Sequence, residues 1–229
     1  ESSSVLYEVQ QSVATITLNR PESLNAMTNG LMKDLVDALA RVETDKSVRV
    51  VVITGSGRGF CAGADLAGHA SAKPSDPEPD GKVDDHFNGA MRAIYNSSVP
   101  TVARVNGAAA GGGFGLALAC DITVAAKNAF FVATFGPKLG IVPDLGTTWN
   151  LPRKAGRARA LGLAMLGDRI TAEQAEAWGL IWKVVDDDRL DAEVELITNK
   201  LVRTSADAMT RIRSVTDAAL DNSFSDQLD

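Results

Sequence analysis

Two glycine-rich segments hold the residues whose types and spacing could do chemistry. Residues 55–64 read GSGRGFCAGA and residues 107–113 read GAAAGGG. Each follows a β-branched run typical of a buried strand and precedes a predicted helix. Glycine lets a ligand approach the backbone closely, and the first turn of a helix has N–H groups without internal partners. Two such loops in one domain could aim paired N–H donors at one oxygen that gains negative charge, forming an oxyanion hole.

A purely structural interpretation of the same glycines stays open at this point. Tight turns and close packing of a helix on a strand also need glycine. The segment at 55–64 lacks the Lys-Ser or Lys-Thr ending of a phosphate-binding loop. It also lacks the G-x-G-x-x-G spacing of a dinucleotide site, so neither of those ligands is predicted.

The cysteines and histidines predict no further chemistry. Cys61 and Cys120 lie among small apolar residues, which is typical of buried free thiols. His69 and His86 have no partner at metal-ligand spacing, so we expect no metal site.

The elements that must position the glycine loops indicate an α/β fold. Val5–Gln10 and Val13–Leu18 alternate apolar and polar residues and predict a hairpin. A helix is expected from about Asn29, and Thr171 with Gln174 has capping-box spacing at the start of another. Buried strands are predicted where β-branched residues run together, at 48–55, 99–107 and 121–126, with a short strand at 181–185. Helical patterns alternate with these strands and dominate after Gly146.

Composition and charge exclude several classes of protein. The 229 residues carry a net charge of −6, which argues against nucleic-acid binding. No apolar run is long enough to cross a membrane. Residues 1–4, ESSS, lack the basic start and apolar segment of a secretory signal, so we expect a cytoplasmic protein.

Four motifs in register make the chain resemble the enoyl-CoA hydratase/isomerase (crotonase) superfamily. They are NRPESLNAM at 19–27, FCAGADL at 60–66, VNGAAAGGGFGLALACD at 105–121 and LGIVPDLGTTWNLPR at 139–153. The resemblance implies a crotonase-like spiral of ββα units over residues 1–188. It also implies a helical assembly region over 189–229, which family members often extend by another helix. A homotrimer or a dimer of trimers is expected, with Leu190, Val194, Leu196, Ile197, Leu201 and Val202 on recurrent helix faces.

The resemblance also implies a substrate and its binding residues. The substrate would be a coenzyme A thioester, so coenzyme A is part of the substrate and no separate cofactor is expected. The oxyanion donors would be the backbone N–H groups of Ala64 and Gly112. The other expected substrate contacts are Ser23, Leu24, Ala26, Ala62, Asp65, Leu66, Gly111, Phe114, Phe135 and Leu139. Family members often have Lys where this chain has Glu22 and Ala67, so a basic residue of a neighbouring subunit is expected to hold the phosphates.

The chain departs from the hydratases of this family at two positions. Hydratases carry glutamates at the positions that match Gly115 and Gly136, and these carboxylates hold a water and move its protons. The remaining carboxylate near the acyl pocket is Asp144. Relatives that isomerise a ring epoxide in phenylacetate catabolism place their working Asp in the same PDxGxTW context. The 156–167 and 171–179 segments agree with that branch.

Each candidate residue could instead have a purely structural role. Asp144, whose pKa the apolar Val142, Leu145 and Phe135 should raise, could instead cap the helix that begins near Gly146. We expect Asp65 to cap a helix and Asp121 to play a structural role at a strand. The aromatic residues that could line an acyl pocket are also ordinary core residues; they are Phe114, Phe135 and Trp149.

The favoured function is an acyl-CoA isomerase that shifts a proton or double bond, or opens a ring epoxide, with Asp144 as acid and base. An enoyl-CoA hydratase, which is a lyase of fatty acid metabolism, is the main alternative. A dehalogenase with Asp144 as nucleophile and a family member that binds coenzyme A without catalysis are further alternatives.

Overall fold

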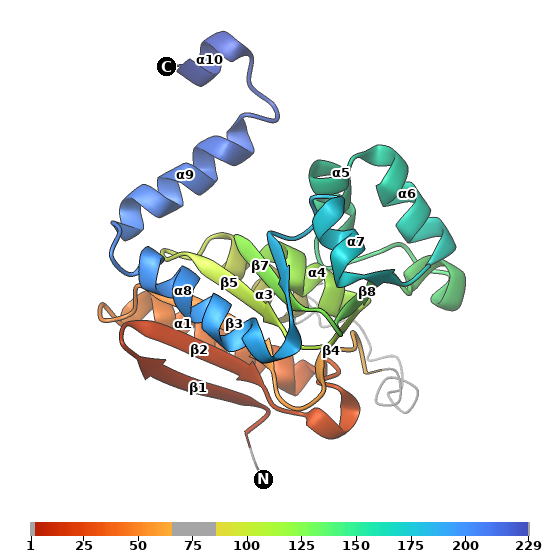
Figure 1. The fold of residues 1–229 in the computed structure, drawn as a ribbon, viewed down its shortest axis with the longest axis horizontal. Coiled ribbons are helices and arrows are strands. Elements are labelled where there is room, and N and C mark those ends of the chain that lie inside the picture. The colour runs from red at the N-terminus through yellow and green to blue at the C-terminus, as the bar shows by residue number, and fades with distance from the viewer. Residues whose placement is uncertain (1–2, 66–85, 229) are drawn as a thin grey trace, which may run out of the picture.

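The computed structural model describes residues 3–65 and 86–228, and its centre is a six-stranded sheet (Figure 1). The strand order is β1-β2-β3-β5-β7-β10. The strands are β1 (Val5–Gln10), β2 (Val13–Leu18), β3 (Val50–Gly55), β5 (Thr101–Val105), β7 (Ile122–Ala126) and β10 (Lys183–Val185). β1 and β2 form the predicted antiparallel hairpin, and the other neighbouring strands pair in parallel. The predicted α/β fold is confirmed.

A second sheet of four short strands was not predicted. Its order is β4-β6-β8-β9, with β4 (Gly59–Cys61), β6 (Ala108–Ala110), β8 (Phe130–Val132) and β9 (Ile170–Thr171). Three of these strands follow a strand of the main sheet, which gives the expected ββ units of the spiral. Strands of two or three residues, such as the AAA of β6, carry no periodic pattern that a sequence analysis could detect.

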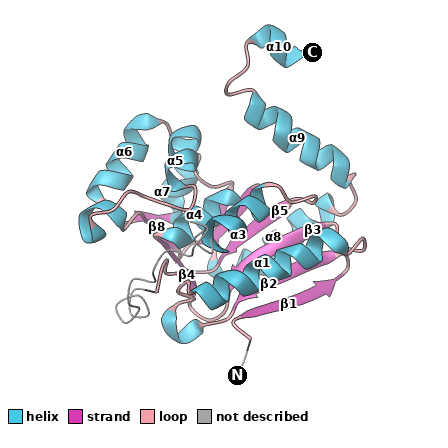
Figure 2. Cartoon of the chain, turned by 180° about the vertical axis from the view of Figure 1, so that it is seen from behind, coloured by secondary structure: helices cyan, strands magenta, loops and turns pink. Residues whose placement is uncertain are grey.

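Helices cover both faces of the main sheet (Figures 1 and 2). α1 (Asn29–Thr44), capped by the Thr28 side chain, and α3 (His86–Tyr95) lie on one face. α4 (Gly112–Ala119) is buried almost all round, as expected for a helix without charges. α8 (Leu190–Leu201) packs on the opposite face, against Val50, Val52, Val102 and Val124.

Apart from a 3-10 turn after β2, the remaining elements follow β8 in the chain. They are the π-helical η2 (Phe135–Leu139), α5 (Thr147–Ala155), α6 (Arg157–Leu166), α7 (Ala172–Ala177), α9 (Ala206–Ala218) and α10 (Phe224–Leu228), with 3-10 turns at Pro21–Ser23 and Asp187–Arg189. The capping box of Thr171 and Gln174 opens α7 as predicted.

The C-terminal helices differ in how they attach to the chain's own core. Leu190, Val194 and Ile197 of α8 are buried against the sheet, so these residues are not free to contact another subunit. By contrast, α9 and α10 bury no residue, and α10 lies farthest from the sheet (Figure 1). Within the described parts of the chain, no helix is both long enough and apolar enough to span a membrane.

Candidate active site

The first glycine loop is held against the segment that follows β2. Asn25 is fully buried, and its side-chain N–H groups donate to the carbonyl oxygens of Gly59 (2.9 Å) and Phe60 (3.2 Å). The Met27 N–H donates to the Gly63 carbonyl at 2.7 Å, and the Asp65 N–H donates to the Met27 carbonyl at 2.9 Å. Together these bonds fix the loop on both sides of Ala64.

The second glycine loop touches the first. Gly111 has a φ of +52°, a conformation that favours glycine, and its N–H donates to the Val132 carbonyl at 2.9 Å. A Cβ atom on Gly63 would lie 2.8 Å from the Ala110 oxygen and 3.2 Å from the Gly112 nitrogen. The structure therefore brings the Ala64 and Gly112 loops together. Within residues 3–65 and 86–228, neither of these two amides donates a backbone hydrogen bond outside the regular helices and strands.

Close packing accounts for two further glycines at the start of α4. A Cβ atom on Gly113 would collide with the Cys61 carbonyl oxygen of β4. A Cβ atom on Gly112 would lie 2.6 Å from Cδ1 of Leu145 and 3.1 Å from the Met27 sulfur. Both interpretations of the glycine run hold at once, because the same residues let α4 approach β4 and leave the first amide of α4 without a helical acceptor.

Gly115 and Gly136, the two positions expected to match hydratase glutamates, lie against backbone atoms of neighbouring segments. A Cβ atom on Gly115 would lie 2.6 Å from the Leu145 carbonyl oxygen and 2.8 Å from the Thr147 hydroxyl oxygen. A Cβ atom on Gly136 would lie 2.8 Å from the Ala164 carbonyl oxygen of α6. Backbone atoms cannot swing aside as a flexible side chain would, so neither position has room for a carboxylate.

Asp144 lies in the turn that closes over Gly115. The residue is exposed, yet nearby protein removes part of its water and raises the pKa of its carboxyl group, which the hydrogen bond from its own backbone N–H only partly offsets. The suggestion that Asp144 caps the next helix is wrong. α5 is capped at Gly146 without any side-chain bond, and the Thr147 N–H donates to the backbone oxygen of Asp144 at 2.9 Å.

The apolar residues expected around Asp144 differ in exposure. Phe135 and Leu145 are buried, whereas Val142 is 76% exposed and Leu139 is 40% exposed. Phe114 is fully buried and packs on Phe131, with ring centroids 5.2 Å apart. Trp149 instead packs edge-on against Tyr95 at 5.6 Å.

The segment expected to contact coenzyme A is fixed mainly by backbone bonds. Leu24 has a φ of +52°, and its carbonyl accepts the Ala62 N–H at 2.9 Å. Ser23 is partly buried and Ala26 is buried. Asp65 forms an ion pair with Arg20 at 3.0 Å. Leu66, His69 and Ala67 lie outside the described residues.

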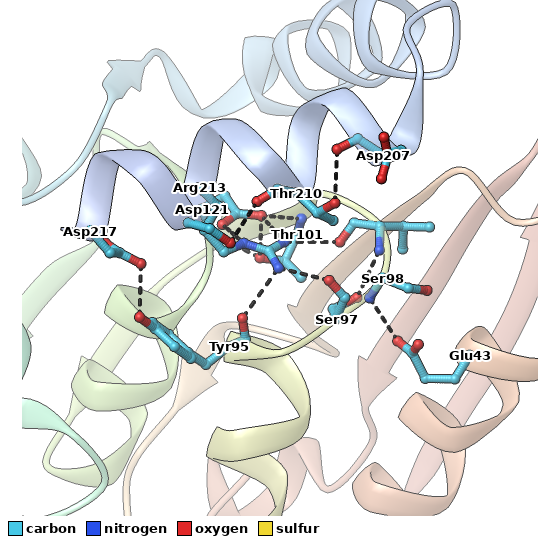
Figure 3. Close-up of polar contacts among 12 residues, drawn as sticks. Glu43, Tyr95, Ser97, Ser98, Thr101, Asp121, Asp207, Thr210, Arg213 and Asp217 are labelled. Atoms are coloured by element: carbon cyan, nitrogen blue, oxygen red, sulfur yellow. Dashed lines mark hydrogen bonds and ion pairs between the residues drawn. The ribbon is translucent and has the colours of Figure 1, made fainter. Parts of the chain in front are cut away.

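A polar cluster that sequence reasoning missed holds α9 to the body (Figure 3). Arg213 forms an ion pair with Asp121 at 2.6 Å and donates to the carbonyl oxygens of Ser97 (2.7 Å) and Val99 (3.1 Å). Asp121 also accepts the Thr101 N–H at 2.8 Å. The structural role expected for Asp121 is confirmed, but its partner lies 92 residues away, and no local pattern indicates it.

The thiols and acidic residues give no other centre in the described part of the chain. Burial raises the pKa of both Cys61 and Cys120 to about 12, so neither is a thiolate at neutral pH. No group of three or more metal-ligating side chains occurs within residues 3–65 and 86–228.

Comparison with known proteins decides the family. The family model of enoyl-CoA hydratase/isomerase matches residues 8–229. The chain belongs to the enoyl-CoA hydratase/isomerase family. The resemblance expected from the four motifs is thereby confirmed, and this is a family of enzymes.

Individual relatives agree with this assignment. The chain is 43% identical to the 1,2-epoxyphenylacetyl-CoA isomerase of Escherichia coli, over 98% of this chain and 86% of that protein. It is 38% identical to a Rhodobacter capsulatus protein named probable enoyl-CoA hydratase, over 98% and 85% of the two chains. The crystal structure of an enoyl-CoA hydratase from a Polaromonas species superimposes with a TM-score of 0.89 at 34% identity, covering 98% of this chain and 87% of that one.

Proposed function

We propose that this enzyme is an acyl-CoA thioester isomerase in which Asp144 moves the proton. The observation that carries the proposal is the closure of Gly115 and Gly136 by backbone atoms. It argues against carboxylates at the two positions expected for a hydratase, and it supports Asp144, in the turn that packs on Gly115, as the acid. Similarity to an epoxyphenylacetyl-CoA isomerase supports the same choice.

The proposed chemistry is a proton shift along the acyl chain. The Asp144 carboxylate removes a proton from a carbon in conjugation with the thioester, and the electron pair moves to the carbonyl oxygen. The amides of Ala64 and Gly112 stabilise that oxyanion, each contributing on the order of 3 kcal/mol. Asp144 then returns the proton to a carbon two bonds away, so the double bond moves and no atom is gained or lost. Isomerisation of a ring epoxide carried by a phenylacetyl-CoA thioester is a second candidate reaction, suggested by the name of the relative.

The proposal also includes the substrate, the assembly and the compartment that the sequence led us to expect. The substrate is a coenzyme A thioester. A basic residue from a neighbouring subunit, in a trimer or a dimer of trimers, binds its phosphates. The reaction takes place in the cytoplasm.

A panel of unsaturated and aromatic acyl-CoA thioesters tests the proposal by mass spectrometry in deuterated water. Isomerisation leaves the mass of the compound unchanged apart from deuterium, whereas hydration adds the mass of water. The wild-type enzyme should isomerise a member of the panel, and Asp144→Asn should lower that rate about 100- to 10,000-fold. Hydration as the main wild-type product would instead support the enoyl-CoA hydratase alternative. Binding without turnover would support a non-catalytic family member, and release of halide from a halogenated aromatic acyl-CoA thioester, added to the panel, would support a dehalogenase.

A further inference from the structure

The turn between Asp144 and α5 places Leu145 in an unusual conformation. Leu145 has a φ of +49°, in the left-handed region that bulky side chains rarely occupy, and Gly146 follows at +72°. Such strain persists only where the surroundings hold it. Here the conformation directs the Leu145 side chain inward, where it is 5% exposed, while the preceding Asp144 stays exposed.

The Leu145 side chain and backbone close the space in front of α4. Its Cδ1 atom lies 2.6 Å from where a Cβ atom of Gly112 would be, and its carbonyl oxygen lies equally close to the corresponding position of Gly115. Leu145, the next residue after the candidate base, therefore packs against the residue that carries the candidate oxyanion amide.

Polar atoms lie just behind this leucine. The Thr147 hydroxyl is buried, has no hydrogen-bond partner within the described residues, and is 2.8 Å from the Cβ position of Gly115. A buried water needs two to four polar partners and room for about one molecule. The Thr147 hydroxyl and the Leu145 carbonyl could form hydrogen bonds to a water molecule. The Leu145 side chain, however, fills the space beside Gly112 and Gly115 that this water would need.

We infer that Leu145 determines reaction specificity by keeping water away from the face of the site between Gly112 and Gly115. The inference rests on the proposed function, because it concerns the same thioester bound beside Asp144. With the side chain removed, a water at this place could add to a 2-enoyl thioester. Its oxygen would bond to the β-carbon, its proton would pass to the Asp144 carboxylate, and that proton would then go to the α-carbon.

Leu145→Gly is the most direct test, because glycine accepts the left-handed conformation without strain. We expect the ratio of hydrated to isomerised product, measured by mass spectrometry on the same thioester, to rise at least about tenfold. Leu145→Met should restore the wild-type ratio, because it refills the space with a side chain of similar volume. Leu151→Ala removes a buried leucine of α5 that does not close the Gly112 or Gly115 position, and it should leave the ratio unchanged.

A second variant covers the case in which Leu145→Gly does not melt cooperatively. Leu145→Asn keeps a similar shape, tolerates a positive φ and offers water a hydrogen bond, so it should also raise the hydrated fraction. An unchanged product ratio in the folded variant, while the wild type isomerises, overturns the inference alone. Absence of isomerisation by the wild type overturns the proposed function.

The contact between Leu145 and Gly112 can also be tested by a stability measurement that does not depend on activity. Gly112→Ala should lower the Tm of the wild-type chain, because the added methyl group meets Cδ1 of Leu145. In the Leu145→Gly background the same substitution should lower the Tm less. Equal losses in both backgrounds would show that Leu145 does not occupy this space, and would overturn the inference.

Discussion

At the scale of single residues, the environment of Asp144 determines when its carboxylate is available. Partial loss of water raises its pKa, and no positive side chain within the described residues forms an ion pair with it. A carboxylate with a raised pKa is a stronger base when ionised, which suits removal of a carbon-bound proton.

The raised pKa of Asp144 predicts how activity and stability change with pH. If Asp144 is the base, kcat/KM should fall as the pH drops through its pKa, at a value above the ordinary value of about 3.9. The folded chain binds this proton more tightly than the unfolded chain does. Stability from this group is therefore greatest at low pH and is lost as the pH rises through the folded pKa. Asp144→Asn should show a Tm at neutral pH equal to or above that of the wild type. A Tm advantage confined to low pH would contradict this sign.

The Thr147 hydroxyl allows a separate test of how a buried polar group without a hydrogen-bond partner affects stability. Its hydroxyl is buried without a recorded partner in the described structure, and an unsatisfied buried hydroxyl costs about 1–3 kcal/mol. Thr147→Val should therefore hold or raise the Tm measured by calorimetry. Thr123→Val is the matched control, because the buried Thr123 hydroxyl donates to the Ala117 carbonyl at 2.7 Å. The control should lower the Tm, and a larger loss in Thr147→Val would indicate a hydrogen bond that this structure lacks.

At the scale of elements, α4 packs closely against the 144–147 turn, and η2 packs closely against α6. The carbonyl oxygen of Leu145, in the turn, lies where a side chain on Gly115 would begin. The carbonyl oxygen of Ala164, in α6, lies where a side chain on Gly136 would begin. Placing a glutamate at either position would therefore require the main chain to move, so Gly115→Glu alone or Gly136→Glu alone should not convert this site into a hydratase.

Two alanine substitutions measure this packing. Gly115→Ala should lower stability by about 1–3 kcal/mol, the usual cost of overpacking, because its Cβ atom would lie 2.6 Å from the Leu145 oxygen. Gly162→Ala, in α6, meets nothing within 4 Å and should raise stability by up to about 1 kcal/mol through helix propensity. Denaturant unfolding of both variants checks the difference. Equal effects of the two substitutions would mean that the turn is free to move away from α4.

At the scale of the whole molecule, α9 is held to the body by polar contacts rather than by a buried apolar face. Arg213 and Asp121 are the centre of these contacts, and Tyr95 adds a hydrogen bond to Asp217 at 2.8 Å (Figure 3). The side chains of Arg213 and Asp121 are 13% and 25% exposed, so the pair is largely screened from water.

Arg213→Met should therefore loosen α9. Removing Arg213 removes a partly exposed ion pair and the hydrogen bonds to Ser97 and Val99, which should cost on the order of 1–3 kcal/mol. Hydrogen–deuterium exchange should become faster across 206–218 and at Thr101. Arg211→Met on the same helix is the control, because its pair with Asp207 is exposed and should change little. Equal exchange in both variants would show that another contact holds α9.

The exposed apolar residues of the C-terminal helices predict self-association. Ile212, Val215, Leu220, Phe224 and Leu228 are 54–82% exposed in the isolated chain. Contact with other copies would cover them, so light scattering at micromolar concentration should give the mass of a trimer or of a dimer of trimers. Phe224→Asp should shift this mass towards the monomer. A wild-type monomer at that concentration would refute the prediction.

The sequence by itself determined the fold class and the family of this protein. Continuous β-branched runs, helical periodicity and capping signals are local, so they predicted β3, β5, β7, α1 and the start of α7. The four motifs identified the family, and the glycines at 115 and 136 already argued against simple hydration.

Only the tertiary structure decided how those glycines are used. The contact between Gly63 and Gly112, the closure of Gly115 by Leu145 and the pairing of Asp121 with Arg213 join residues that are far apart in the chain. It also decided that Gly146, rather than Asp144, caps α5, because two residues with positive φ angles, 145 and 146, separate Asp144 from the first helical residue. Local propensity does not specify such contacts, because they form only when separate elements pack together.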